Sequence, residues 1–422
     1  MTYKRYDKYK YTNVKWLGKI PEHWGISKLK YLSDIGTGDK DTINKEENGM
    51  YPFFVRSQTV EKISTYTYDG EAVLTAGDGV GVGKVFHYIN GKFDFHQRVY
   101  KISDFKKVKA KFFYYYIKEN FIKETEVNNA KSTVDSIRLP MIQQFPVVIP
   151  SVDEQERIIK FLDKKTLEID SLIEEKEKLI ELLKEKREAI ITEAVTKGVD
   201  KNVKMKESGV EWIAEIPSHW KKFRFKNICN INPNKSELTI DNERLVSFVP
   251  MENIKSGKID LSIIKKLGEV YSGYSYFSDG DIIMAKVTPC FENGNIAIVE
   301  KMENKVGFGT TELHVLRVNE KVNNKYLYYL LQENGFKSKA ISSMYGVGGL
   351  KRIPTEFIAN FEIYIPDVKE QIEIIKYIEG KLNNIDIILK ETNKSIEKIK
   401  EYKKSLISEV ITGKIDVRGC KG

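Results

Sequence analysis

The segment Trp16-Leu17-Gly18-Lys19-Ile20-Pro21-Glu22-His23-Trp24 returns 196 residues later as Trp212-Ile213-Ala214-Glu215-Ile216-Pro217-Ser218-His219-Trp220. These two segments contain all four tryptophans of the 422-residue chain. An internal repeat sets the architecture within which every other pattern is interpreted. The chain therefore contains two copies of one module.

Further matched segments follow in the same order along both copies. They pair Asp69-Gly70 with Asp279-Gly280, Lys111–Tyr115 with Lys325–Tyr329, Arg138-Leu139-Pro140 with Arg352-Ile353-Pro354, and Phe145–Asp200 with Phe361–Asp416. The second copy gains 14 residues between the His-Trp motif and the Asp-Gly pair. One framework with two sets of loops predicts two related but non-identical ligands. The alternative is a duplication whose loops drifted without functional meaning.

Each copy ends in a segment with the pattern of a long helix. No proline occurs between Pro150 and Pro217 or after Pro366. Apolar residues recur every three or four positions with Lys and Glu between them, which indicates an amphipathic helix of about 45 residues, roughly 65 Å long. Ser151 or Asp153 can cap the first helix and Gly198 can end it. Because each helix needs a partner for its apolar stripe, we expect the two to form an antiparallel coiled coil.

The remaining sequence predicts two mixed α/β (α+β) globular domains related by a pseudo-twofold internal repeat. Strands are expected at Ala72–Thr75, Gly83–Tyr88, Arg98–Ile102 and Phe145–Ile149, and in the second copy at Ile282–Ala285, Asn295–Val299, Leu313–Val318 and Phe361–Ile365. Lys111–Asn120 and Lys325–Asn334 predict short helices whose tyrosines pack in the core. The expected boundaries are 1–150 and 201–366 for the domains, 151–200 and 367–416 for the helices, and 417–422 for a tail.

Charge is distributed unevenly along the chain. The net charge is +9, yet residues 1–150 carry 24 Lys/Arg against 17 Asp/Glu, whereas residues 151–200 carry 10 against 14. Basic charge on the globular part favours a polyanionic partner, although many lysine-rich proteins have such a surface. No apolar run reaches the ~18–20 residues that cross a bilayer, and residues 1–6 lack an apolar signal core. Three distant cysteines fit a reducing cytoplasm and form neither a disulfide framework nor a metal site.

Motifs for catalysis and cofactor binding are incomplete. In Gly77-Asp78-Gly79-Val80-Gly81-Val82-Gly83-Lys84-Val85, Asp78 replaces the first glycine of a phosphate-binding loop and Val85 replaces its Ser/Thr. We interpret this segment, and Thr288–Gly294 in the second copy, as tight loops between strands. Asn232-Pro233-Asn234 lacks the second proline and the aromatic residue of the amino-methyltransferase tetrad. His23 and His219 are interpreted as structural, and no catalytic residue or metal ligand is predicted.

Four features together resemble the specificity subunits of type I restriction–modification systems. They are the doubled Ile-Pro-x-His-Trp, the doubled Ile-Pro-x-Val-x-Glu-Gln at the start of each long helix, the Glu193 and Glu409 regions with their Thr-x-Gly and Thr-Gly-Lys endings, and the variable segments between. The resemblance covers essentially the whole chain. It implies that each variable segment is a target recognition domain and that the repeated helices are conserved spacers. It also implies two methyltransferase subunits docked on the scaffold, restriction subunits joining them, and S-adenosylmethionine bound by the methyltransferase, with no cofactor in this chain.

Double-stranded DNA is thus the expected ligand, read as two half-sites with an uninspected spacer. Lys and Arg would neutralise phosphates while a few loop side chains contact base edges. The candidates for DNA contact are Lys84, His96, Gln97, Arg98, Lys286, Asn293, Thr310, Thr311, Lys351 and Arg352. For each of them the alternative is a solvated surface residue.

The partner-binding helices are represented by Leu172, Ile180, Leu183, Ile388, Ile396 and Ile399. Lengthening Leu172–Leu183 by one heptad should change the spacer and keep both half-sites. The alternatives that remain are a specificity subunit of a modification-only system, a coiled-coil adaptor without DNA preference, and a self-sufficient enzyme, which the incomplete motifs disfavour.

Overall fold

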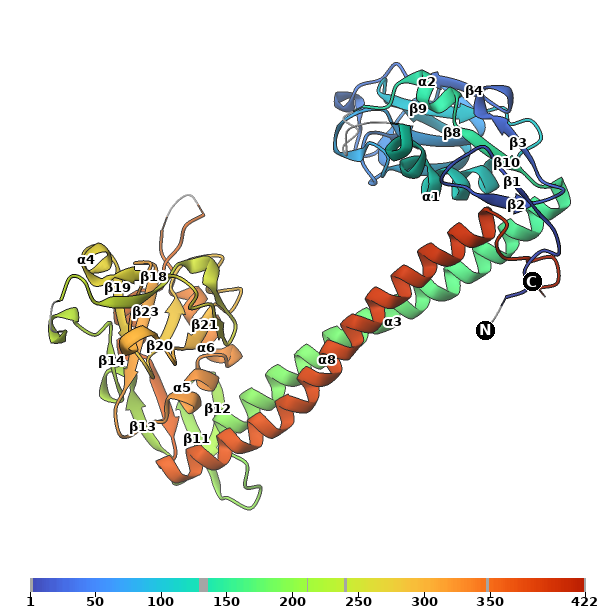
Figure 1. The fold of residues 1–422 in the computed structure, drawn as a ribbon. Coiled ribbons are helices and arrows are strands. Elements are labelled where there is room, and N and C mark those ends of the chain that lie inside the picture. The colour runs from blue at the N-terminus through green and yellow to red at the C-terminus, as the bar shows by residue number, and fades with distance from the viewer. Residues whose placement is uncertain (1–2, 129–135, 211, 239–240, 347–348, 421–422) are drawn as a thin grey trace. The chain divides into compact units, whose positions relative to one another are not determined.

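The computed structural model describes residues 3–128, 136–210, 212–238, 241–346 and 349–420. It divides into two compact units, Met1–Glu177 with Asn393–Gly422, and Lys178–Thr392. Two long helices, α3 (Val152–Lys197) and α8 (Val368–Ile411), each contribute one segment to either unit. Figure 1 labels the helices and strands of both units.

The first unit is built on a six-stranded sheet with one parallel pair, β5 with β8. Its order is β4 (Asp34–Thr37), β9 (Val99–Ser103), β7 (Tyr68–Ala76), β8 (Phe86–Phe95), β5 (Tyr51–Phe54) and β6 (Glu61–Ile63). Helix α1 (Ala110–Asn128) packs on β7 and β8, where Phe121 meets Phe86 with ring centroids 6.2 Å apart. Two antiparallel strand pairs lie outside this sheet. They are β1 (Tyr9–Tyr11) with β2 (Lys19–Pro21), and β3 (Gly25–Lys28) with the distant β10 (Pro146–Ile149). A short helix, α2 (Leu139–Gln143), precedes β10.

The second unit repeats this frame. Its central sheet is β14 (Cys229–Ile231), β23 (Leu313–Val318), β20 (Ile282–Ala285) and β21 (Ile296–Ile298). The flanking pairs are β11 (Met205–Val210) with β12 (Ile213–Pro217), and β13 (Lys221–Arg224) with β24 (Glu362–Ile365). Its helices are α5 (Asn324–Leu330), α6 (Asn334–Ser342) and α7 (Thr355–Asn360). The duplication read from the sequence is therefore confirmed in the fold.

The two units differ in the stretch where the second copy is longer. In the first unit β5 and β6 extend the central sheet, whereas the second unit forms a separate four-stranded sheet. That sheet consists of β18 (Ile264–Lys266), β15 (Leu245–Val249), β22 (Val306–Gly309) and β19 (Ser275–Ser278), with α4 (Leu267–Val270) and the short pair β16 (Ile254–Lys255) and β17 (Lys258–Ile259) beside it. The added residues thus change the topology of the variable part and leave the repeated frame intact.

Seven of the eight expected strands are confirmed with small shifts of their ends. The expected strand Gly83–Tyr88 was misplaced, because β8 runs from Phe86 to Phe95 and residues 83–85 belong to the preceding loop. The helix expected at Lys325–Asn334 was wrong in extent, because the chain breaks into α5 and α6 at Gln332 and Glu333. Glu333 caps α6 by accepting a hydrogen bond from the Phe336 amide, and a capping residue starts a new helix. The expected core position of the tyrosines holds for Tyr116 and Tyr326, whose side chains are fully buried.

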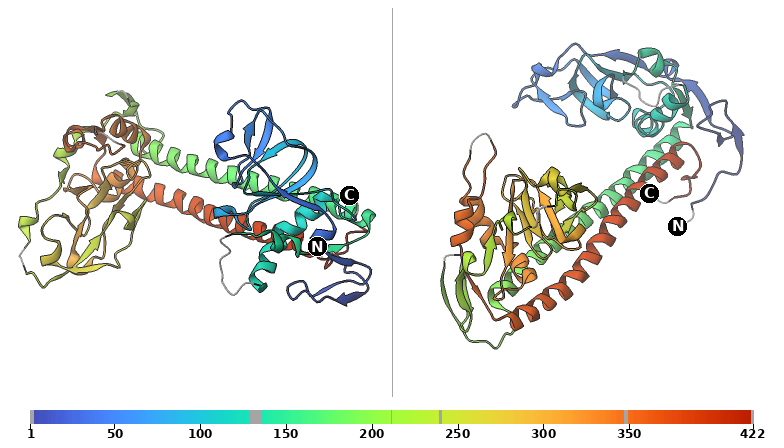
Figure 2. Two further views of the ribbon diagram at one scale, coloured as in Figure 1. Left: turned by 90° about the horizontal axis from the view of Figure 1, so that it is seen from above. Right: turned by 60° about the vertical axis from the view of Figure 1, so that its left-hand side comes forward.

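Helices α3 and α8 run antiparallel within each unit, as the apolar stripes predict (Figures 1 and 2). In the first unit Lys403 Nζ lies 2.6 Å from an Asp170 oxygen, and in the second Arg187 Nε lies 3.8 Å from Asp386. Helix α3 spans 46 residues, about 69 Å. It ends at Gly198, which adopts φ +75° and donates its amide to the Ala194 carbonyl. A left-handed residue after the last turn favours glycine.

Candidate nucleic-acid interface

The repeated Glu-Gln pair joins the start of each long helix to its own module. Gln155 is fully buried, donates from Nε2 to the Lys107 and Pro150 carbonyls (2.9 and 3.0 Å), and accepts the Lys109 amide at Oε1 (2.7 Å). Gln371 repeats all three bonds at 3.0, 2.9 and 2.7 Å, with the Lys321 carbonyl, the Pro366 carbonyl and the Asn323 amide. This motif is therefore a structural clamp that occurs twice.

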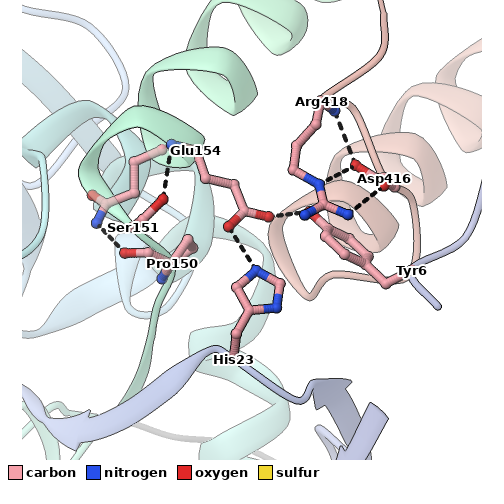
Figure 3. Close-up of polar contacts among 8 residues, drawn as sticks. Tyr6, His23, Pro150, Ser151, Glu154, Asp416 and Arg418 are labelled. Carbon is pink, nitrogen blue, oxygen red and sulfur yellow. Dashed lines mark hydrogen bonds and ion pairs between the residues drawn. The ribbon is translucent and has the colours of Figure 1, made fainter. Parts of the chain in front are cut away.

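The repeated histidines bind the glutamate of the same motif. His23 Nε2 lies 3.0 Å from Glu154, whose other oxygen accepts a hydrogen bond from the Tyr6 hydroxyl (Figure 3). The Arg418 guanidinium lies 4.8 Å from the centre of the Tyr6 ring and also binds Asp416. In the second unit Glu370 contacts His219 at 2.7 Å, and Trp220 Nε1 donates to it at 3.0 Å. Both histidines therefore hold the start of a long helix, which is the structural role expected for them.

The candidate DNA-contacting residues gather at the other end of each central sheet. β9 ends at Ser103, shortly before the backbone amide that Gln155 binds. β23 ends at Val318, shortly before the backbone amide that Gln371 binds. Arg98 and Glu312 stand directly before the first residues of these strands. β9 has five residues and β23 has six. Since such strands span about 17–20 Å, their starts lie well away from the clamped start of the long helix within their own unit.

In the first unit, two arginines converge on one carboxylate. Asp78 accepts Arg56 Nη1 at 3.1 Å and Arg98 Nη1 at 2.6 Å, and both guanidinium groups remain exposed, with 43% and 62% of the side chain accessible. Burial opposes ionisation of Asp78, but the hydrogen bonds from Arg56 and Arg98 outweigh it and lower the pKa of this carboxyl. The result is a fixed, positively charged end of the sheet.

His96 and Gln97 support this arginine pair in different ways. The His96 ring is only 2% exposed, and its Nδ1 accepts the Arg98 amide at 2.9 Å. Burial and the neighbouring Arg56 lower the pKa of His96. The ring therefore positions Arg98, and we revise its expected role from contact to positioning because a buried edge cannot reach a base. Gln97 is exposed and donates Nε2 to Asp41 at 2.8 Å.

In the second unit, an anion stands at the equivalent end of the sheet, where the first unit has Arg98. Arg352 donates Nε and Nη2 to the two carboxylate oxygens of Glu312, both at 2.9 Å. Hydrogen bonds from Arg352 lower the pKa of Glu312. Thr310 Oγ1 accepts the Glu312 amide at 3.2 Å. Lys286 is half-buried at the end of β20, while Thr311 and Lys351 are exposed beside the pair.

Two further candidates lie on the loops that follow the central strands. Lys84 is exposed on the β7–β8 loop, and Asn293 is exposed on the β20–β21 loop. Among the residues that the structure describes, neither side chain forms a hydrogen bond or ion pair with the charged pairs. Both segments are strand-connecting loops, as expected from their sequences.

Sequence reasoning missed the residues that organise the arginines. Asp78 was seen only as a defect in a glycine-rich loop, and Arg56, Asp41 and Glu312 were not singled out. Arg56 and Asp78 are 22 residues apart, and Glu312 and Arg352 are 40 apart. Pairs so distant carry no local spacing signal. The matched position of Arg98 and Glu312 before equivalent strands was the one available clue.

The long helices keep part of their apolar surface open within each unit. Of the residues predicted to bind partners, Leu172 and Ile388 are 42% and 43% exposed, and Ile396 is buried at 7%. The other three, Ile180, Leu183 and Ile399, are half-buried. Additional exposed apolar side chains on the same helices are Leu167, Leu179, Leu182, Ile372, Tyr377 and Ile387.

Neither a metal cluster nor a membrane span is found among the described residues. No group of three His, Cys, Asp or Glu side chains in the described ranges is placed to hold a metal ion. Within the same ranges no helix is both long and apolar enough to cross a bilayer. Asn232, in the incomplete tetrad, has φ +54° and its side-chain oxygen accepts the Val315 amide at 2.9 Å. This segment therefore ends β14 against β23.

Comparison with known proteins identifies the same repeat. The family model for the type I restriction modification DNA specificity domain matches residues 21–182 and 217–398. The EcoDI specificity subunit of Escherichia coli, a type I restriction enzyme, is 26% identical over 415 residues, covering 94% of this chain and 90% of that protein. A chain from a structure on complex assembly and conformational transition of the type I R-M system has a TM-score of 0.70 at 12% identity, covering 94% and 99% of the two chains. The HsdS subunit from Thermoanaerobacter tengcongensis has a TM-score of 0.51 at 12% identity, covering 94% and 98%.

Two mixed α/β modules, each followed by a long helix and each with its own charged sheet end, define a protein that recognises DNA through two target recognition domains. The chain belongs to the type I restriction–modification DNA specificity family. Its function is that of a specificity subunit, and the two family matches fall one in each copy of the repeat.

Proposed function

We propose that each module reads one half of a bipartite, asymmetric DNA site through the charged end of its central sheet. The observation that carries the proposal is the pair Arg98 and Glu312. Val99 pairs with Ala76 and Leu313 pairs with Ala285 in equivalent registers, so the two preceding residues occupy the same place in the frame. One is a cation and the other an anion. Arg98 keeps an exposed guanidinium, whereas Glu312 binds Arg352 with both oxygens, so the two sheet ends present different sets of donors. Different sets of donors favour different base edges, and therefore two different half-sites.

We further propose that the long helices dock two methyltransferase subunits, which restriction subunits then join. Both long helices expose several apolar side chains, among them Leu167, Leu182 and Ile387 at 72%, 52% and 48%, and such side chains are available for contact with another protein. S-adenosylmethionine would be held by the methyltransferase, in the cytoplasm. This chain would contribute recognition and spacing and no bond-making step.

The test is to co-express the chain with the methyltransferase encoded beside it, in a host without DNA methylation, and to map methylated bases across the genome. We expect one motif with two different half-sites separated by unspecified bases. Methylation without a two-part motif would contradict the proposal and favour the adaptor alternative. Adding every neighbouring subunit and measuring cleavage of unmodified DNA then separates a restriction system from a modification-only system.

A further inference from the structure

Arg352 is held side-on by a carboxylate at the end of the second unit's sheet. Its Nε and Nη2 each donate to one oxygen of Glu312 at 2.9 Å, which leaves 45% of the arginine side chain and 30% of the glutamate accessible. Among the described residues no partner is recorded for Nη1. The pairing therefore uses one edge of the planar guanidinium and leaves the edge formed by Nη1 and the second hydrogen of Nη2.

The backbone on both sides of this pair is fixed by hydrogen bonds. Arg352 and Tyr345 exchange amide-to-carbonyl bonds of 2.9 and 3.2 Å, and the Ile353 amide donates to the Lys286 carbonyl at 2.9 Å. The Lys286 amide in turn donates to the Glu312 carbonyl at 3.0 Å. Arginine and glutamate are thus mounted on paired strand ends, which is how a side chain is held in one orientation before a ligand arrives.

The open edge of Arg352 presents two parallel N–H donors. Guanine offers two acceptors, O6 and N7, at matching separation on its major-groove edge, and arginine donating to both is the commonest specific protein–DNA contact. Adenine offers one acceptor and one donor there, so it can satisfy only half of the fork. The donors of Arg352 therefore favour guanine over the other bases.

A phosphate would also accept two hydrogen bonds, but the surroundings of Arg352 disfavour it. Glu312 neutralises the arginine and would lie close to a second anion, whereas a guanine edge is uncharged. Lys286 and Lys351 stand beside the pair, and no salt bridge is recorded for either of them among the described residues. Lysine is a flexible point charge suited to phosphate contact. The two lysines can therefore contact phosphates of the DNA backbone while Arg352 contacts a base.

We infer that Arg352 is a specificity-determining residue that reads one guanine in the half-site of the second module, and that Glu312 is its positioning residue. The inference rests on the proposed function of this sheet end in DNA reading. It assigns an individual base contact to a residue pair with no counterpart in the first module, where Asp78 holds two arginines by single bonds.

The test uses the complex with its methyltransferase and DNA carrying the mapped site. Each guanine of the site is replaced in turn by 7-deazaguanine, which lacks the N7 acceptor, and binding is measured by competition. Replacement of one guanine in one half-site should weaken binding of the unmodified complex at least several-fold. The upper bound is the loss of about 5- to 150-fold for a whole bidentate base contact, because O6 still accepts one of the two hydrogen bonds. The same replacement should have little further effect on the Arg352→Ala complex, because the contact is already absent.

Two further variants separate base reading from a phosphate contact. Arg352→Lys keeps the charge and loses the fork, so it should lose discrimination at the same base as Arg352→Ala. Glu312→Gln removes a negative charge and with it the bidentate ion pair that orients Arg352. It should reduce discrimination at that base while binding of unrelated DNA stays equal or rises, a change that simple unfolding would not produce. Arg224→Ala, an exposed arginine paired with Glu362 elsewhere in the unit, is the matched control.

Several outcomes would overturn the inference. One is uniform weakening on every DNA sequence with a salt dependence reduced by about one phosphate contact. Another is an Arg352→Lys complex that discriminates as well as the unmodified complex. A third is sensitivity to 7-deazaguanine that persists in Arg352→Ala. The absence of any two-part motif with the unmodified chain would instead overturn the proposed function itself, so the two failures are distinguishable.

Discussion

Gln155 and Gln371 each satisfy three backbone groups that burial would otherwise leave without hydrogen bonds. A buried amide or carbonyl without a partner costs about 1–3 kcal/mol, which explains why the same residue stands at the start of both helices. Glu154 and Glu370 serve the same junction by binding His23 and His219. At the scale of single residues, the repeated motifs therefore build the frame. The different pairings of Asp78 with Arg98 and of Glu312 with Arg352 distinguish the two reading ends.

His314 supplies a pH-dependent prediction. It lies on β23 with 1% exposure, and its Nε2 is 3.0 Å from the Ile353 carbonyl beside Arg352. Burial lowers the pKa of His314 to about 4. The unfolded chain takes up this proton below about pH 6.5 and the folded chain only near pH 4, so stability is present at neutral pH and is lost as the pH falls.

We expect the free energy of unfolding to fall by up to about 3 kcal/mol between pH 6.5 and 4 from this residue. His314→Gln keeps a donor for Ile353 and cannot titrate, so its unfolding free energy should be less sensitive to pH by that amount. Urea unfolding followed by tryptophan fluorescence at several pH values measures the difference, in which the titration of carboxylates cancels. Identical pH profiles for the two proteins would refute the assignment.

At the scale of elements, the regular structure followed from local patterns. The strands at Ala72–Thr75 and Ile282–Ala285 and the helix after Ser151 were predictable because periodicity and capping residues are local signals. The break at Glu333 was missed because the side chain that caps α6 lies within an uninterrupted helical pattern. The second sheet of the longer module was missed because short strands such as Leu245–Val249 depend on pairing with distant segments.

The exposed leucines of α3 lead to a prediction about partner docking. Leu179 and Leu182 are 41% and 52% exposed, so changing both to Ser should alter the stability of the isolated chain by less than about 0.5 kcal/mol each. If they contact a methyltransferase subunit, the double variant should retain less of that subunit on co-purification. Leu245→Ser, a 46% exposed leucine on β15, is the matched control. Unchanged recovery of the methyltransferase would remove this face from the docking surface.

The spacing role of the helices is tested by lengthening both of them together. Arg187 and Asp386 lie opposite one another, so one heptad inserted after Leu183 and one after Leu389 keep the helices paired and their faces in phase. The insertion adds about 10 Å to each helix, equivalent to about three base pairs of DNA. The methylated motif should keep both half-sites and gain about three unspecified bases. Altered half-sites with an unchanged spacer would show that the helices are not a ruler.

At the scale of the whole chain, two copies of one frame carry two different reading ends. Their existence could be predicted from the sequence because Trp16–Trp24 and Trp212–Trp220 show the duplication directly. The individual contacts could not, because Arg56 meets Asp78 and Glu312 meets Arg352 only after the sheets form. Of the two sheet ends, the second has the better defined reading group, because Arg352 pairs side-on with the single carboxylate of Glu312.

The most direct test of independent reading is the methylation motif of an Arg56→Ala, Arg98→Ala double variant compared with that of Arg352→Ala. Both are expressed with the neighbouring methyltransferase, and the unmodified chain is the reference. If the two modules read independently, the first variant relaxes or changes one half-site only, and Arg352→Ala changes only the other. Changes in both half-sites from either variant, or the same half-site altered by both, would contradict independent reading.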